Sequence, residues 1–103
     1  MKTKEGEEIF RKHPKLNFLV SNKGRVFSLE THKILKQAKN SWGYRAVSGG
    51  HFAHILVYET FHGRIKKGMD IDHIDRNKNN NTPENLRMVT KSINAFNRRT
   101  KRH

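Results

Sequence analysis

Two short apolar stretches enclose a polar stretch rich in asparagine near the C-terminal end, and this arrangement limits the folds open to the chain. Residues 71–74 are typical of a strand, and residues 86–89 are typical of its partner. Between them, residues 76–85 contain Pro83 and several asparagines, which favour a loop. The pattern therefore predicts an antiparallel hairpin with a long polar connection.

A helix is predicted directly after this hairpin. Thr90 is a plausible N-cap, and Ile93, Phe96 and Asn97 lie at helical spacing. We expect a helix from residue 91 to about residue 99 that packs on the hairpin. Asn94 would then face the first strand.

Side chains suited to metal-assisted phosphodiester hydrolysis gather in this part of the chain. A neutral imidazole such as that of His73 can take a proton from water near neutral pH. Asp72 and Asn94 carry oxygen atoms that suit a hard cation and would leave other coordination positions for water and phosphate. Because neighbouring side chains of a strand point to opposite faces, we expect His73 and Asp72 to approach a phosphate from different sides.

The segment also matches a known motif. The run M-D-I-D-H-I-D-R-N-K-N-N-N-T-P-E-N-L-R-M-V-T-K-S-I-N resembles the HNH nucleases, in which a ββα-metal fold holds one divalent cation against the scissile phosphate. The resemblance implies that Asp72 and Asn94 hold the metal and that His73 is the general base. Asn85 would take the middle position, where it braces either the loop or the His73 ring.

Two departures from the family pattern bear on the metal and on the loop. The last ligand is Asn94 where some relatives have histidine, which favours Mg²⁺, or alternatively Mn²⁺, over Zn²⁺. Arg76 stands where relatives usually have glycine, which would strain a left-handed turn but could add a phosphate contact.

The other asparagines and histidines are interpreted as structural. Turn formation and capping are the usual roles of asparagine in such a loop, and we assign no catalytic role to Asn77, Asn79, Asn80 and Asn81. Surface or core roles are assigned in the same way to His13, His32, His51, His62 and His103. His54 is expected to be a buried hydrogen-bonding residue near the floor of the active site.

A second motif lies upstream. Residues 19–28, L-V-S-N-K-G-R-V-F-S, resemble the short "VSN-x-GRV-x-S" module that often precedes HNH domains in phage and intron-encoded homing endonucleases. Asn22 to Gly24 suits a hairpin turn, in which Gly24 can adopt a positive φ. Strands are expected at about 17–20, 26–29, 34–37 and 44–48, forming one small antiparallel sheet. Residues 1 to about 8 are expected either to fray or to cap a short helix at 7–11.

These segments predict an α+β fold in a single HNH nuclease domain, residues 1–103. The N-terminal β module would cover 16–50 and a buried connecting helix 52–62. The ββα-metal motif would cover 69–99, and a basic tail would follow at 98–103.

The charge of the chain points to a polyanionic partner. Lys and Arg total 22 against 9 Asp and Glu, which gives a net charge of +13. Nucleic acid is favoured over a membrane because no apolar run of spanning length is present. The candidate DNA-binding residues are Arg25, Arg45, Arg76, Lys78, Arg98, Arg99, Lys101 and Arg102.

We therefore interpret the chain as a phage or mobile-element HNH endonuclease that uses one divalent ion, Mg²⁺ or Mn²⁺. Its expected partner is double-stranded DNA, and one set of ligands predicts nicking by a monomer, with a DNA-induced dimer as the alternative. The absence of cysteine is compatible with the host cytoplasm. Two other functions stay open: a non-catalytic basic nucleic-acid-binding protein, and a partner-activated component of a phage DNA-processing complex.

Overall fold

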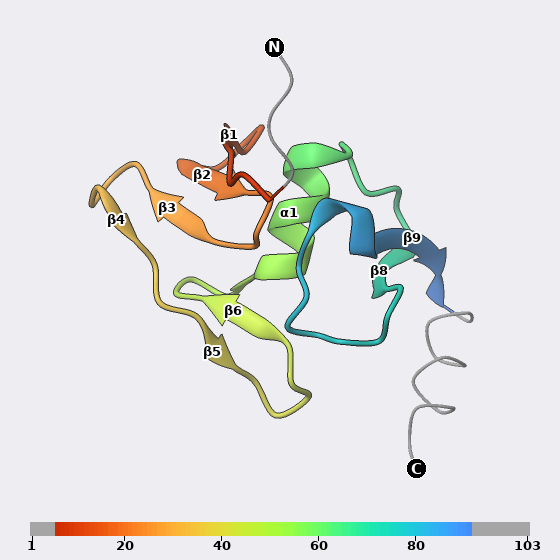
Figure 1. Ribbon diagram of the computed structural model, residues 1–103. Coiled ribbons are helices and arrows are strands. Elements are labelled where there is room, and N and C mark those ends of the chain that lie inside the picture. The colour runs from red at the N-terminus through yellow and green to blue at the C-terminus, as the bar shows by residue number, and fades with distance from the viewer. Residues whose placement is uncertain (1–5, 92–103) are drawn as a thin grey trace.

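The computed structural model describes residues 6–91, which form three small antiparallel sheets and one α-helix (Figure 1). This arrangement confirms the predicted α+β class. The four-stranded sheet contains, in spatial order, β1 (Phe10–Lys12), β2 (Phe18–Ser21), β3 (Val26–Ser28) and β4 (Lys33–Ile34). The three-stranded sheet contains β5 (Ala38–Lys39), β6 (Arg45–Val47) and β7 (His51–Phe52). The third sheet is the pair β8 (Met69–His73) and β9 (Leu86–Thr90).

The N-terminal strands form two sheets, so the expectation of a single sheet is wrong. Of the strand predicted at 34–37, only Ile34 lies in a strand, where it pairs with Phe27 of the first sheet; the next strand begins at Ala38, which pairs with Ala46 of the second sheet. Between these two pairings, the Gln37 side chain donates a hydrogen bond of 2.7 Å to the carbonyl of Gly24. The chain thus leaves the first sheet at this point and starts the second.

The short helix expected at 7–11 is also absent, and β1 takes its place. The backbone N–H of Ile9 donates to Asn22 Oδ1 at 2.9 Å, and the N–H of Asn22 donates to the Ile9 carbonyl at 3.0 Å. Phe10 then pairs with Ser21 on β2. An extended chain at a sheet edge satisfies backbone groups that a single helical turn would leave to water.

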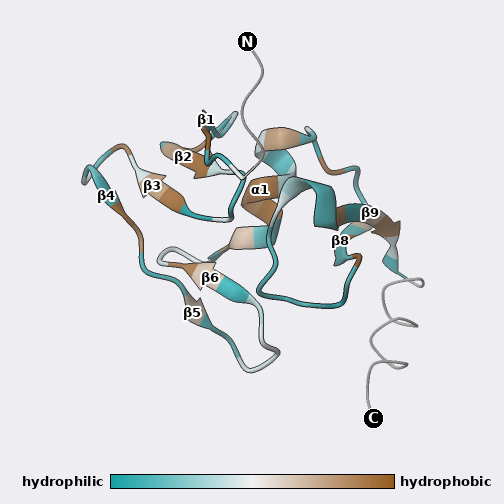
Figure 2. Cartoon of the chain, viewed as in Figure 1, coloured by the Kyte–Doolittle hydropathy of each residue, from teal (hydrophilic) through white to brown (hydrophobic). Residues whose placement is uncertain are grey.

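The helix α1 (Ala53–Phe61) lies between the N-terminal strands and the β8–β9 hairpin (Figure 1). Its bounds agree closely with the predicted helix at 52–62. Figure 2 shows α1 as largely apolar, whereas the connection between β8 and β9 is hydrophilic. The core draws on the N-terminal strands, the helix and the hairpin, through the buried side chains of Val20, Val26, Val47, Leu56, Val57, Ile71 and Leu86.

The hairpin has the long connection that the sequence predicted. Asp72 lies opposite Arg87, and His73 lies opposite Leu86. A short 3₁₀ turn, η1 (Pro83–Asn85), leads the loop into β9. Among residues 6–91, no helix combines the length and the apolar character needed to cross a lipid bilayer.

Candidate active site

Strand β8 places Asp72 and His73 on opposite faces of the hairpin. Ile71 and His73 are each 3% exposed and face the core side of the strand, whereas Asp70 and Asp72 are only partly buried. The alternation is that of a regular strand. The two candidate groups are therefore neighbours in sequence whose side chains leave the backbone in different directions.

The Asp72 carboxylate forms an ion pair across the hairpin. Arg87 donates to Asp72 Oδ2 from Nη2 at 3.0 Å and from Nε at 3.2 Å. Asp70 forms a similar pair with Lys91 Nζ at 3.3 Å. Each carboxylate on this face thus has a basic partner on β9 or directly after it, and these pairs fix the orientation of the two acidic side chains.

His73 lies in a buried cluster of rings. Its ring centroid is 5.2 Å from that of His54 on α1 and 6.1 Å from that of Tyr44. Its Nε2 is 2.6 Å from Asn81 Oδ1, and Asn81 is itself 3% exposed. The interpretation of Asn81 as a turn former therefore missed its contact with His73. No sequence signal separates it from its neighbours in the loop, because only burial distinguishes these asparagines.

His54 belongs to this ring cluster. It stacks on Tyr44 with centroids 4.9 Å apart and lies 5.8 Å from Phe52. Burial lowers the pKa of His54 from 6.5 to about 3, the charge of His73 adds to this effect, and Asp70 opposes it. His54 is thus a neutral ring near neutral pH, and its burial agrees with the prediction.

A cavity opens beside the ring cluster. It is lined by Asn40, Trp42, Tyr44, Phe52, His54, Ile55, Asp70 and Ile71. Trp42, at its rim, is 71% exposed. Asp72 and His73 are not among the lining residues, so the cavity adjoins the candidate catalytic pair without containing it.

Asn85 connects the two ends of the loop. Its Oδ1 accepts from the backbone N–H of Asp75 at 3.0 Å, and its Nδ2 donates to Asp75 Oδ1 at 2.8 Å and to the Asn80 carbonyl at 2.9 Å. Hydrogen bonds from Asn80, the Asn77 backbone and Asn85 lower the pKa of Asp75. Of the two roles considered for Asn85, these contacts match the bracing of the loop, while the amide that contacts the His73 ring is Asn81.

Arg76 adopts the left-handed conformation that the sequence comparison anticipated. Its φ is 65°, and its backbone N–H donates to the His73 carbonyl at 3.0 Å. A residue with a side chain is strained at such a φ. The exposed Arg76 thus occupies a position that would favour glycine.

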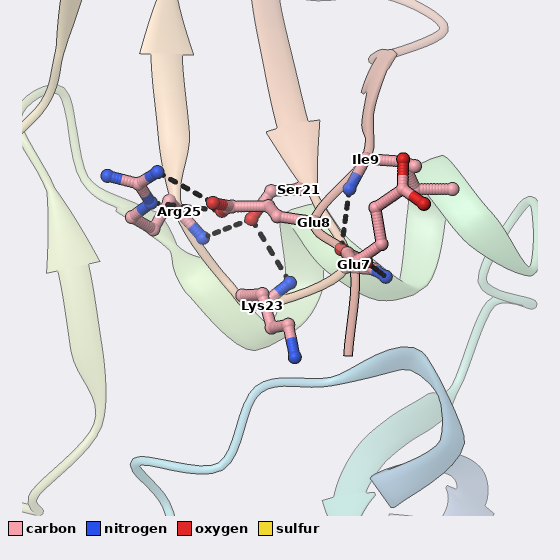
Figure 3. Close-up of polar contacts among 7 residues, drawn as sticks. Glu7, Glu8, Ile9, Ser21, Lys23 and Arg25 are labelled. Atoms are coloured by element: carbon pink, nitrogen blue, oxygen red, sulfur yellow. Dashed lines mark hydrogen bonds and ion pairs between the residues drawn. The ribbon is translucent and has the colours of Figure 1, made fainter. Parts of the chain in front are cut away.

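Three of the candidate DNA-binding residues also hold the fold together. Arg25 donates to both Glu8 oxygens, at 2.9 and 2.6 Å, and this bonding lowers the pKa of Glu8 to about 2 (Figure 3). Arg45 Nε donates to Asn79 Oδ1 at 2.8 Å. Lys78 Nζ donates to the Trp42 carbonyl at 2.6 Å and lies 4.6 Å from the Tyr44 ring centroid.

The remaining predicted site residues follow the described part of the chain. Asn94, the helix predicted at 91–99 after its first residue, and the basic residues Arg98, Arg99, Lys101 and Arg102 lie outside residues 6–91. Within 6–91, no cluster of three or more His, Cys, Asp or Glu side chains could hold a metal. Of the two predicted metal ligands, Asp72 therefore lies within the described residues, whereas Asn94 lies beyond Lys91.

Known proteins resemble both halves of the chain. The HNH endonuclease family matches residues 51–96, and the NUMOD4 motif matches residues 4–50. DNA endonuclease I-HmuI of Bacillus phage SP01 is 38% identical over 88 residues, which cover 79% of this chain and 51% of that protein. Protein 3.8 of Escherichia phage T7 is 45% identical over 47 residues, covering 46% of this chain and 39% of that one.

The fold of the chain is also similar to that of a solved HNH endonuclease structure. The structure that describes DNA binding and cleavage by the HNH homing endonuclease I-HmuI aligns with a TM-score of 0.69 and 35% identity. The alignment covers 92% of this chain and 59% of the I-HmuI chain, so the present chain spans little more than half of that relative. The family matches on both halves, together with this structural likeness, establish that the chain belongs to the HNH endonuclease family and has a NUMOD4 motif before its HNH segment.

Proposed function

We propose that this chain is a metal-dependent endonuclease that hydrolyses phosphodiester bonds of double-stranded DNA. The observation that carries the proposal is the placement of Asp72 and His73 at adjacent positions of β8, with side chains on opposite faces. Such a pair can hold a cation with one side chain and take a proton with the other. The likeness to a phage DNA endonuclease supports DNA as the substrate.

The metal is assigned to Asp72 and Asn94. The Asp72 side chain is 14% exposed and presents hard carboxylate oxygens, which fits Mg²⁺ or Mn²⁺. A cation held there would stabilise the negative charge that develops on the phosphate and on the leaving oxygen. Since Arg87 already contacts Asp72 Oδ2, this pair also orients the carboxylate.

His73 is assigned as the general base. The buried ring contacts with Tyr44 and His54 limit its movement, so the imidazole would meet the attacking water in a constant orientation. Proton removal by a positioned group is worth about 10² to 10⁴ in rate. His73→Ala should lose about this much activity while keeping its affinity for DNA.

The net charge of +13 supports binding to the DNA backbone, with Arg25, Arg45, Arg76 and Lys78 and the basic C-terminal residues as candidate contacts. One set of ligands in one chain reaches one scissile phosphate. We therefore propose that the monomer nicks one strand.

Incubation of the pure protein with supercoiled plasmid and Mg²⁺ tests these proposals. Open circles should form first, EDTA should stop the reaction, and Mg²⁺ or Mn²⁺ should restore it. His32→Ala, which changes an exposed histidine in the turn between β3 and β4, serves as the control for His73→Ala. Undiminished cleavage in EDTA would refute the metal site.

Two other results of the same experiment would redirect the assignment. Binding without cleavage by the isolated chain would support a binding protein or a component that needs a partner. Linear DNA from the first turnover, at a rate that rises with the square of protein concentration, would show that the enzyme dimerises on DNA.

A further inference from the structure

We propose that Asn81 is a positioning residue for His73, and that the turn between β2 and β3 holds Asn81 in place. The NUMOD4 segment would then support the active site directly, in addition to any contact that it makes with DNA. The inference rests on the proposed role of His73 as the base.

The first step is the contact between the two buried side chains. Asn81 Oδ1 lies 2.6 Å from His73 Nε2, and each residue is 3% exposed. Because an amide oxygen accepts hydrogen bonds, Nε2 carries the hydrogen in this pair. A neutral imidazole has one N–H, so its lone pair is then on Nδ1, and Asn81 selects the tautomer as well as the ring orientation.

The second step is the close approach of Gly24 to Asn81. A Cβ added to Gly24 would lie 3.1 Å from Asn81 Cβ and 3.1 Å from the Asn81 carbonyl oxygen. Such contacts are tighter than ordinary van der Waals packing. The backbone of Gly24 thus lies directly against Asn81, with no space between them for a side chain.

The third step is the rigidity of the turn that carries Gly24. Ser21 is fully buried, and its Oγ accepts from the backbone N–H of Lys23 at 3.1 Å and of Arg25 at 3.0 Å (Figure 3). The Gly24 N–H donates to the Ser21 carbonyl at 3.1 Å, and its own carbonyl accepts from Gln37 at 2.7 Å. These hydrogen bonds fix the turn from both sides, so that Gly24 presents a rigid backbone to the loop.

The loop needs such support at its middle. Asn85 connects its two ends, through Asp75 and the Asn80 carbonyl. Its middle contacts the N-terminal strands, at Asn81 through Gly24 and at Asn79 through Arg45. The position of Asn81, and with it that of the His73 ring, consequently depends on a segment that precedes it by more than fifty residues.

The test starts with Asn81. Asn81→Leu keeps a similar volume but removes the acceptor, and should lower the single-turnover rate of plasmid nicking roughly 10- to 100-fold, the scale seen for residues that orient functional groups. Asn81→Asp retains an acceptor oxygen and should recover much of that rate. DNA affinity should stay near the wild-type value in both variants.

A double variant distinguishes positioning from a general effect on the fold. If Asn81 acts through His73, then adding Asn81→Leu to His73→Ala should cause no further loss of rate. Circular dichroism and melting temperature are recorded for every variant. Asn81→Ala, which removes the acceptor without adding an apolar branch, repeats the test if Asn81→Leu is unfolded.

Gly24→Ala tests the support from the turn, with Gly50→Ala as its matched control. Their φ values are +87° and +82°, so both alanines are strained, but a Cβ at Gly50 meets nothing within 4 Å. Only Gly24→Ala should lower the nicking rate, and its effect should not add to that of Asn81→Leu.

The outcomes separate this inference from the proposed function. Full activity of His73→Ala would overturn both. An inactive His73→Ala combined with a wild-type rate for a folded Asn81→Leu or Asn81→Ala would overturn the positioning role alone. Equal rates for Gly24→Ala and Gly50→Ala would overturn the support from the turn.

Discussion

The turn between β2 and β3 and the loop between β8 and β9 both connect antiparallel strands, but they are stabilised differently. The turn is short and is closed by the buried Ser21 hydroxyl. The loop is long and hydrophilic, and it depends on amide and carboxylate side chains, chiefly Asn85 and Asp75 (Figure 2). A short turn can hold its own shape, whereas a loop that carries functional groups needs contacts from other parts of the chain.

Both regions bury polar as well as apolar residues, and in the N-terminal strands the polar ones include Ser21 and Ser28. Val20 and Val26 of the N-terminal strands are fully buried apolar side chains. In the hairpin and its loop, buried polar residues such as His73 and Asn81 accompany the apolar ones. Buried polar groups cost free energy unless they are hydrogen-bonded, so both the turn at Ser21 and the hairpin loop depend on their hydrogen bonds.

The largest expected effect tests whether the two acidic residues of β8 differ in function. Asp72 and Asp70 share a face, and each forms an ion pair with a basic residue. Asp72→Ala should lower cleavage by roughly 10² or more, since a metal contributes several kcal/mol at the transition state. Asp70→Ala should stay within a few-fold of wild type. Cleavage is measured for both variants over a range of Mg²⁺ concentrations. If both lose the same activity, Asp72 and Asp70 do not differ in function.

The second prediction compares the residues that organise the two connections. Ser21→Ala should lower the free energy of unfolding by about 1–3 kcal/mol, because it removes the acceptor of two backbone N–H groups at a buried site. Asn85→Ala should cost less stability, since its partner Asp75 is exposed and water can replace the lost bonds. Asn85→Ala should nevertheless lower cleavage, because the loop ends separate. Urea unfolding measures the stabilities, and a larger loss for Asn85→Ala would contradict this ranking.

The third prediction concerns the pH dependence of stability. The pKa of His54 falls from 6.5 to about 3 on folding, so between these values the unfolded chain binds a proton that the folded chain excludes. The stability associated with His54 is therefore complete above pH 6.5 and decreases as the pH falls towards 3. His54→Phe, which keeps an aromatic ring, should reduce this loss in urea titrations on either side of pH 6.5.

That comparison is best made above pH 4.5, since Glu8 titrates below this value with its pKa lowered to about 2 by Arg25. An identical pH profile for His54→Phe and wild type would show that other groups cause the loss.

The smallest expected effect is at Arg76. Arg76→Gly should raise stability by about 1 kcal/mol or less, because it relieves the φ of 65° but adds freedom to the unfolded chain. Arg76→Ala keeps the strain and should show no such gain. If Arg76 contacts phosphate, both variants should weaken DNA binding to a similar extent, measured by fluorescence anisotropy. If Arg76→Ala gained as much stability as Arg76→Gly, backbone strain at this position would not explain the gain.

Much of the fold could be predicted because local patterns determine it. The apolar stretches around 71–74 and 86–89 correspond to β8 and β9, and the helix at 52–62 corresponds to α1. The segment at 7–11 could not be assigned correctly, because its strand exists through pairing with β2. The roles of Asp72, His73, Asn85 and Asn94 in catalysis stay predictions.

The sequence by itself determined the family, the hairpin with its long loop, and the candidate catalytic pair, because these depend on residue type and short-range spacing. Only the tertiary structure decided which asparagine contacts His73, because several asparagines in one loop have the same local preferences. It likewise decided that Gly24 lies against that asparagine, since residues so far apart in sequence meet only when the N-terminal strands and the hairpin pack around α1.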